Sequence, residues 1–174
     1  MKKYWLLLLL IGTGIMIVVM AKTGATLKTP DTPKGILDLE FAYNSSKTAT
    51  VLNAWAPNGN VDNISAAKIN TYLDFIFLFF YSFFLFFTCD KIARITKSKL
   101  GAFIANGALY AGILDVVENA GMLMTLSGGA SGTTAFITTF CSVIKWALAI
   151  AAVLYLLGGC IQLLLQKKFS LLLA

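Results

Sequence analysis

The sequence contains no histidine and only three cysteines among its 174 residues. Histidine and cysteine are the usual protein ligands of haem, zinc and copper, and no two of Cys89, Cys141 and Cys160 form a C-x-x-C pair. We therefore expect no metal site and no cofactor. Because the number of cysteines is odd and all three lie within or beside apolar segments, we expect free thiols rather than a disulfide framework.

Charged residues are also scarce, at 13% of the chain, whereas apolar residues make up 58% and the mean hydropathy is +0.79. Apolar residues account for only about 45–50% of ordinary soluble domains. The composition therefore argues against a soluble domain and predicts an integral membrane protein.

Four apolar stretches are close to or above the length of about 20 residues that spans the hydrocarbon core of a bilayer. They are residues 4–20, 72–89, 100–126 and 134–165. Continuous apolar runs at residues 6–11 and 75–80 lack the alternation of a transmembrane β-barrel, and helices satisfy their own backbone hydrogen bonds in lipid. We predict an all-α integral membrane four-helix bundle that forms a single domain over residues 1–174.

Lysine and arginine residues flank these stretches in three groups, at 2–3, 91–99 and 167–168. An excess of positive charge marks the cytoplasmic ends of membrane helices, and four spans place all three groups on one side. We therefore expect a multi-pass protein of the cell membrane, and of the inner membrane in a bacterium, with both termini cytoplasmic and residues 21–70 outside. The net charge of +6 then reflects topology, and no nucleic-acid partner is expected.

The first apolar stretch has a second interpretation. Lys2 and Lys3, the apolar run and the segment ending at Ala21 also fit a secretory signal peptide with a cleavage site. We favour a retained span because the apolar run is long for a signal peptide and contains Gly12 and Gly14, which suit helix packing.

The external loop is predicted to form short helices that cap the bundle. Ile36, Leu39 and Tyr43 share one helical face, with Asp38 and Glu40 elsewhere. A second helix is expected to begin at a Ser45 or Ser46 cap and to end near Trp55, with Val51, Leu52 and Trp55 as its apolar contacts. A third is expected to begin at Asn63 or Ser65 and to continue into the second span.

The ionisable residues inside the spans are the most informative part of the sequence. Each of Asp74, Asp115, Glu118 and Lys145 costs about 2.5–3.5 kcal/mol at the centre of a bilayer and therefore needs a partner or a function. On the third span, spacings of three and four place small and polar residues on one face: Gly101, Ala105, Ala108, Gly112, Asp115 and Asn119.

The fourth span has a similar face, which contains Lys145 at about the depth of Asp115 and Glu118. We therefore predict an ion pair between the third and fourth spans. A weaker polar stripe on the second span includes Asp74 and Tyr81. These residues outline a buried carboxylate–lysine group in the outer half of the bundle, whose candidate ligand-binding or proton-handling residues are Asp74, Tyr81, Asp115, Glu118, Asn119 and Lys145.

Two interpretations of this group remain open. It fixes the pairing and register of the helices, or it is a small binding or proton-handling site open to the exterior. Three acids face one lysine, so a cation or an amine-bearing ligand suits the surplus of carboxylates best.

The run from Gly112 through Asp115 and Glu118 to Asn119, with Leu73 and Asp74 before it, resembles uncharacterised bacterial four-helix membrane proteins. The resemblance implies the fold and no activity. The layout is also similar to claudin-type proteins, but the claudin W-x-x-W motif and paired loop cysteines are absent.

We expect a non-enzymatic membrane protein, either an accessory subunit or a binder of a small ligand or lipid. Its expected partners are the lipid bilayer and a second copy or another membrane protein that contacts the small-residue faces. One alternative is a small proton- or cation-coupled transporter. Another is a membrane enzyme with Asp115 or Glu118 as general base, although no nucleophile, metal ligand or cofactor motif accompanies them.

Overall fold

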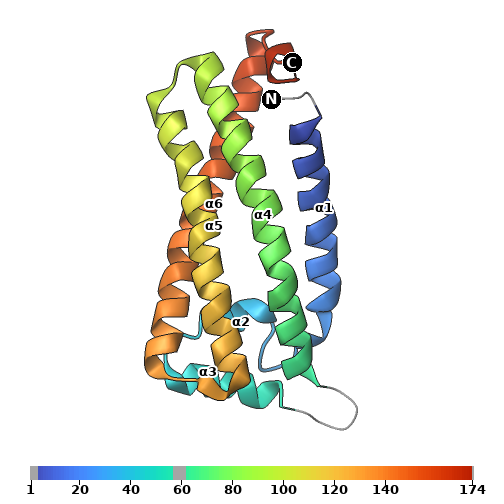
Figure 1. Cartoon of the computed structure of the whole chain (residues 1–174), viewed down its shortest axis with the longest axis vertical. Helices are drawn as coiled ribbons and strands as arrows, with labels where there is room; N and C mark the ends of the chain where they lie inside the picture. The colour runs from blue at the N-terminus through green and yellow to red at the C-terminus, as the bar shows by residue number, and fades with distance from the viewer. Residues whose placement is uncertain (1–3, 57–61, 174) are drawn as a thin grey trace.

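The computed structural model describes residues 4–56 and 62–173, which contain helices and no strand (Figure 1). This confirms the predicted all-α fold. In chain order the elements are α1 (Trp5–Thr23), η1 (Ala25–Leu27), α2 (Ile36–Glu40), α3 (Ser45–Ala54), α4 (Asn63–Thr96), α5 (Lys99–Met124), η2 (Thr125–Gly129), α6 (Gly132–Leu165) and α7 (Ser170–Leu173).

Four of these helices are long and apolar enough to cross a membrane. They are α1, α4, α5 with its continuation through η2, and α6. Each contains one of the predicted apolar stretches, except that Tyr4, the first residue of the first stretch, precedes α1. Helix α4 begins at Asn63, as predicted, and continues without a break through the second stretch.

Polar side chains fix where the long helices begin. Asp62, Ser98 and Ser131 each precede a helix and accept a hydrogen bond from the backbone N–H three residues later. The N–H and hydroxyl of Ser65 both donate to Asp62, and these bonds hold the pKa of that carboxyl below its ordinary value.

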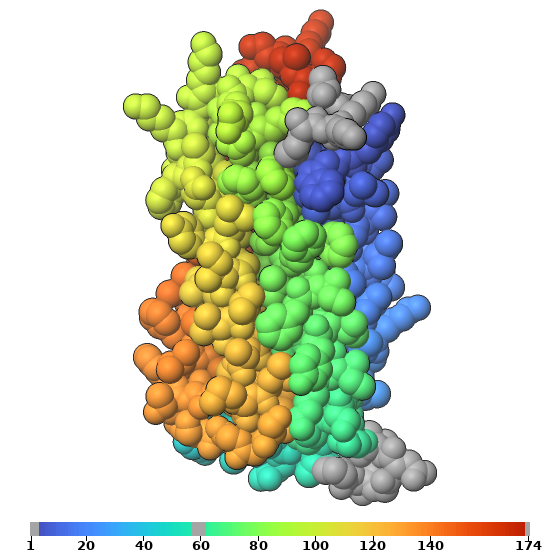
Figure 2. Space-filling view, viewed as in Figure 1, coloured from blue at the N-terminus to red at the C-terminus, as the bar shows by residue number. Residues whose placement is uncertain are grey.

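The long helices run alternately up and down, and three of them form the core. Helices α4, α5 and α6 all pack against one another, whereas α1 packs along α4 (Figure 1). Figure 2 shows α4 between α1 and α5 on one face of the molecule. Close approach of α4 and α5 depends on Gly112, where a Cβ atom would lie 2.9 Å from the Cβ and Oγ atoms of Ser82.

Helices α2 and α3 lie across one end of the long helices, which we call the α2–α3 end (Figure 1). Trp55 is fully buried there and donates from Nε1 to the Leu27 carbonyl and the Thr32 hydroxyl, both at 3.0 Å. Val51, Leu52 and Trp55 belong to one apolar cluster, as predicted.

Two details of this end differ from the sequence prediction. The cap of α3 is Asn44, whose side chain accepts from the Lys47 N–H, and not Ser45 or Ser46. Helix α2 contains only five residues, so Tyr43 lies beyond it and is half exposed. Asparagine is as good a helix cap as serine, and the spacing of apolar residues alone did not distinguish them.

The opposite end carries the start of α1, the connection between α4 and α5, and α7 (Figure 1). The described basic residues that were predicted to be cytoplasmic gather at this end: Lys91, Arg94, Lys97, Lys99, Lys167 and Lys168. Lys2 and Lys3 lie outside the described residues. Cys89, Cys141 and Cys160 are free thiols.

Candidate functional site

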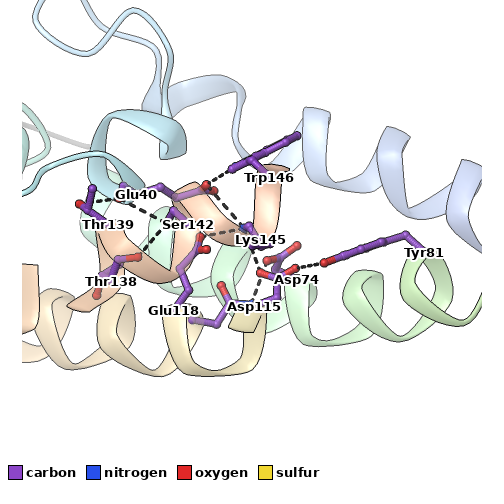
Figure 3. Close-up of polar contacts among 11 residues, drawn as sticks. Glu40, Asp74, Tyr81, Asp115, Glu118, Thr138, Thr139, Ser142, Lys145 and Trp146 are labelled. Carbon is purple, nitrogen blue, oxygen red and sulfur yellow. Dashed lines mark hydrogen bonds and ion pairs between the residues drawn. The ribbon is translucent and has the colours of Figure 1, made fainter. Parts of the chain in front are cut away.

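Helices α5 and α6 bring Lys145 into contact with two acids. The Nζ atom of Lys145 lies 3.0 Å from Asp115 Oδ1 and 2.9 Å from Glu118 Oε1 (Figure 3). All three side chains are buried. The predicted ion pair between these two helices is therefore confirmed, and Lys145 bridges both candidate acids.

Helix α4 contributes the next layer of contacts. The Tyr81 hydroxyl donates to the second oxygen of Asp115 at 2.8 Å. Asp74 Oδ2 accepts from the Asn119 amide of α5, also at 2.8 Å. All six residues singled out in the sequence therefore lie in one connected region, and Figure 3 shows Asp74, Asp115 and Tyr81 beside Lys145.

A fourth acid enters the site from α2, where the sequence gave no indication of it. Glu40 is buried, and its Oε2 atom lies 3.6 Å from Lys145 Nζ and accepts from Trp146 Nε1 at 3.1 Å. The Glu40 carbonyl accepts from the hydroxyls of Thr139 (2.9 Å) and Ser142 (3.4 Å) on α6. The C-terminal end of α2 is thus anchored to α6 directly beside Lys145 (Figure 3).

Sequence reasoning placed Glu40 away from the apolar face of its short helix, in the polar surroundings of a loop. The available signal lay on α6, where Thr138, Ser142 and Lys145 follow one another on a face that continues toward the α2–α3 end. Buried polar side chains of this kind need hydrogen-bond partners. No acid on α5 lies opposite the first turns of α6, so the partner had to come from another element.

We call Glu40, Asp74, Asp115, Glu118 and Lys145 the carboxylate–lysine cluster. Its four acids and one lysine give a formal charge of −3 when every group is ionised. One lysine cannot neutralise such a surplus, and uncompensated buried charge is costly. The cluster is therefore suited to acquire protons or a positively charged group.

A cavity of about 380 Å³ extends from the cluster between α1, α4 and α6, and α2 closes its end. Four cluster members line its polar end: Glu40, Asp74, Asp115 and Lys145. Apolar side chains dominate the remainder, including Ile17 of α1, Phe84 of α4 and Val153 of α6. The cavity is thus polar near α2 and apolar toward the middle of the long helices.

Two acids that line the cavity keep one carboxylate oxygen without a hydrogen bond to the described residues. Asp74 uses only Oδ2, and Glu40 uses only Oε2. Both residues are more than nine-tenths buried. Asp115, by contrast, uses both oxygens, on Lys145 and Tyr81. Two acids that line the cavity therefore each have an acceptor atom that the protein itself leaves open.

Within the part of the chain that the structure describes, no three acidic, histidine or cysteine side chains are grouped so that they could hold a metal ion. No protein-family model, curated protein or solved structure matches the chain. The chemistry of the site therefore has to be inferred from the residues of this chain alone.

Proposed function

We propose that this chain is a non-enzymatic membrane protein that binds one small amphipathic molecule or lipid in the cavity between α1, α4 and α6. The observation that supports the proposal is the division of that cavity into a polar end at the carboxylate–lysine cluster and an apolar remainder. Ligand sites commonly combine apolar walls with a few placed polar groups. An amphipathic ligand likewise has a polar head and an apolar remainder.

The proposal includes an orientation in the bilayer. The basic residues at the end opposite α2 and α3 would face the cytoplasm, in keeping with the charge bias of membrane proteins. The α2–α3 end would then be an external cap, and in a bacterium the membrane would be the inner one. The polar end of the cavity would lie in the outer half of the membrane, beneath that cap.

The size of the cavity limits what it can hold. Its volume of about 380 Å³ is near the lower end of the range of about 300–1,000 Å³ for small-molecule sites. It suits a single short chain or a compact apolar body better than a phospholipid with two chains. Helices α1 and α6 do not pack closely against each other, so an entrance from the lipid would lie between them.

The test is to fill the cavity and measure which molecules remain bound. Ala149 lines the cavity, whereas Ala147 is exposed on another face of α6, so Ala149→Phe and Ala147→Phe differ only in position. Native mass spectrometry of the purified protein should show a small bound amphiphile on the wild type and on Ala147→Phe. Ala149→Phe should lose it.

Bulk lipids at the protein surface should bind all three proteins equally, which separates them from the cavity ligand. If the wild type carries no small amphiphile from its native membrane, or if Ala149→Phe retains it fully, binding in this cavity is refuted. Circular dichroism of Ala149→Phe checks that the helices remain folded.

A small proton- or cation-coupled transporter is the second candidate, and the surplus of three negative charges in the cluster favours it. Purified protein in liposomes would then conduct protons or cations, and Asp115→Asn would abolish the flux. Absence of flux in the wild type would leave ligand binding as the explanation of the cavity.

A further inference from the structure

We infer that the molecule held in the cavity carries a protonated amine at its polar end, bound between Asp74 and Glu40, with a single apolar chain along α1 and α6. The inference rests on the proposed function and adds the chemical class of the ligand. It follows from which carboxylate oxygens already accept hydrogen bonds within the protein and which acids line the cavity.

The lysine of the cluster is already occupied. Lys145 contacts Asp115 and Glu118 at 3.0 and 2.9 Å, so its positive charge is shared first with the two acids of α5. It lies farther from Glu40, at 3.6 Å, and forms no ion pair with Asp74. Negative charge therefore remains at the polar end of the cavity, where Asp74 and Glu40 outnumber the single charge of Lys145.

The open oxygens of Asp74 and Glu40 define the binding position for a donor. An ammonium group has three N–H donors and no acceptor, so it has enough donors for both oxygens. A hydroxyl has a single donor and can satisfy only one of them. The donor capacity and the charge of an ammonium group both match this end of the cavity.

Trp146 provides a second feature that suits a cation. Its ring lines the cavity, and its Nε1 atom donates to Glu40. The Nζ atom of Lys145 already lies 5.5 Å from the ring centroid, which shows that a positive charge is accommodated beside it. An aromatic ring next to the Glu40 carboxylate favours an amine over a neutral group.

The same features disfavour other ligands. A carboxylate or phosphate head would meet the surplus of negative charge at close range. A metal ion would require converging ligands, and the described residues contain no such group. The apolar walls formed by Ile17, Phe84 and Val153 require that the remainder of the ligand be hydrocarbon.

A series of probes with one chain and three heads tests the inference. Dodecylamine, dodecanol and dodecanoate are added at equal concentration to the purified protein in detergent, and bound probe is measured by native mass spectrometry. Dodecylamine should bind the wild type about tenfold more tightly than dodecanol, an advantage typical of one well-placed charged contact. Dodecanoate should bind most weakly.

Variants then locate the preference. Asp74→Asn should remove most of the advantage of dodecylamine and leave dodecanol binding nearly unchanged, because only the charged acceptor is altered. Glu40→Gln should also reduce this advantage, because it removes the charge of the second acceptor. Asp90→Asn is the matched control, since Asp90 lies near the opposite end of α4 and pairs with Arg94 at 2.7 Å.

The outcomes separate this inference from the proposed function. Equal binding of dodecylamine and dodecanol, or a preference for dodecanoate, overturns the amine inference and leaves an amphiphile site in place. Failure of all three probes to bind overturns both. Should Asp74→Asn not fold, the probe series on the wild type and on Glu40→Gln still decides the question.

Discussion

The Nζ atom of Lys145 on α6 lies 3.6 Å from the carboxylate of Glu40, the last residue of α2. A helix of five residues outside the long helices thus reaches the charge that α5 and α6 bury between them. Glu40 therefore both helps to close one end of the cavity and contributes a charge to the carboxylate–lysine cluster.

Replacement of Glu40 should loosen α2 without unfolding the long helices. Glu40→Ala removes the acceptor of Trp146 and one of the three acids that pair with Lys145. Amide hydrogen exchange in residues 34–43 should therefore accelerate about tenfold, equivalent to about 1.4 kcal/mol of local stability. Glu40→Gln keeps the acceptor for Trp146 and should accelerate exchange less.

Asp31→Ala serves as the control, since Asp31 is exposed and forms no ion pair within the described residues. Unchanged exchange in α2 of Glu40→Ala would show that Thr139, Ser142 and the apolar contacts hold α2 without the carboxylate.

Replacement of Lys145 should destabilise the whole protein. Lys145→Met leaves the buried acids of the cluster without their cation, and the loss of one partner of a buried ion pair typically costs about 3–5 kcal/mol. Thermal unfolding in detergent at neutral pH should therefore occur at a clearly lower temperature. Lys99→Met, at an exposed position, should have little effect.

The double variant Lys145→Met with Glu118→Gln provides the matched comparison. Removal of one uncompensated acid should restore part of the lost stability, because Glu118 is fully buried and its Oε1 atom pairs with Lys145. A Lys145→Met protein as stable as the wild type would contradict a stabilising role for the ion pair.

The contact of Lys145 with Asp115 could be predicted because α5 and α6 form an antiparallel pair with a short connection. Asp115 and Lys145 are each 15 residues from Ala130 in that connection, so equal rise per residue brings them to the same depth. The small residues on one face of α5 indicated which side of that helix packs against its neighbours. Gly112 and Ala108 on that face are buried, as expected.

The contribution of Glu40 could not be predicted in the same way. Helix α2 has five residues, too few for a periodic pattern to establish which face is buried. Its position depends on a loop in which Gly35 adopts a φ of +66°, a conformation that gives α2 its direction. The cavity also depends on α1 packing along α4, and the nearly uniform apolar surface of α1 gave no sign of that arrangement.

The proposed orientation predicts which residues an impermeant reagent can reach. In a variant with Cys89, Cys141 and Cys160 replaced by alanine, Ala49→Cys on α3 should react with a membrane-impermeant maleimide in intact cells. Lys99→Cys at the opposite end should react only after the membrane is permeabilised. Both positions are exposed, so access to the reagent and not burial decides the result.

The reverse pattern would place the α2–α3 end in the cytoplasm and would contradict the assignment from charge. Reaction of both positions in intact cells would indicate that the reagent had crossed the membrane, and a cytosolic marker protein with a free thiol tests for that directly.

The packing of α4 against α5 predicts a stability loss at Gly112 that a second substitution relieves. A Cβ atom at Gly112 would lie 2.9 Å from the Cβ and Oγ atoms of Ser82, closer than carbon atoms pack, so Gly112→Ala must push the helices apart. Overpacking of this kind costs about 1–3 kcal/mol, and the melting temperature in detergent should fall.

Gly158 on α6 is the matched control, because a Cβ atom there would have no neighbour within 4 Å. Gly158→Ala should leave stability unchanged or raise it slightly, since alanine favours helix more than glycine. Ser82→Gly added to Gly112→Ala removes the atoms that collide and should recover stability despite the second glycine. If Gly112→Ala behaves like Gly158→Ala, then α4 and α5 are not in the close contact that brings Asp74 to Asn119.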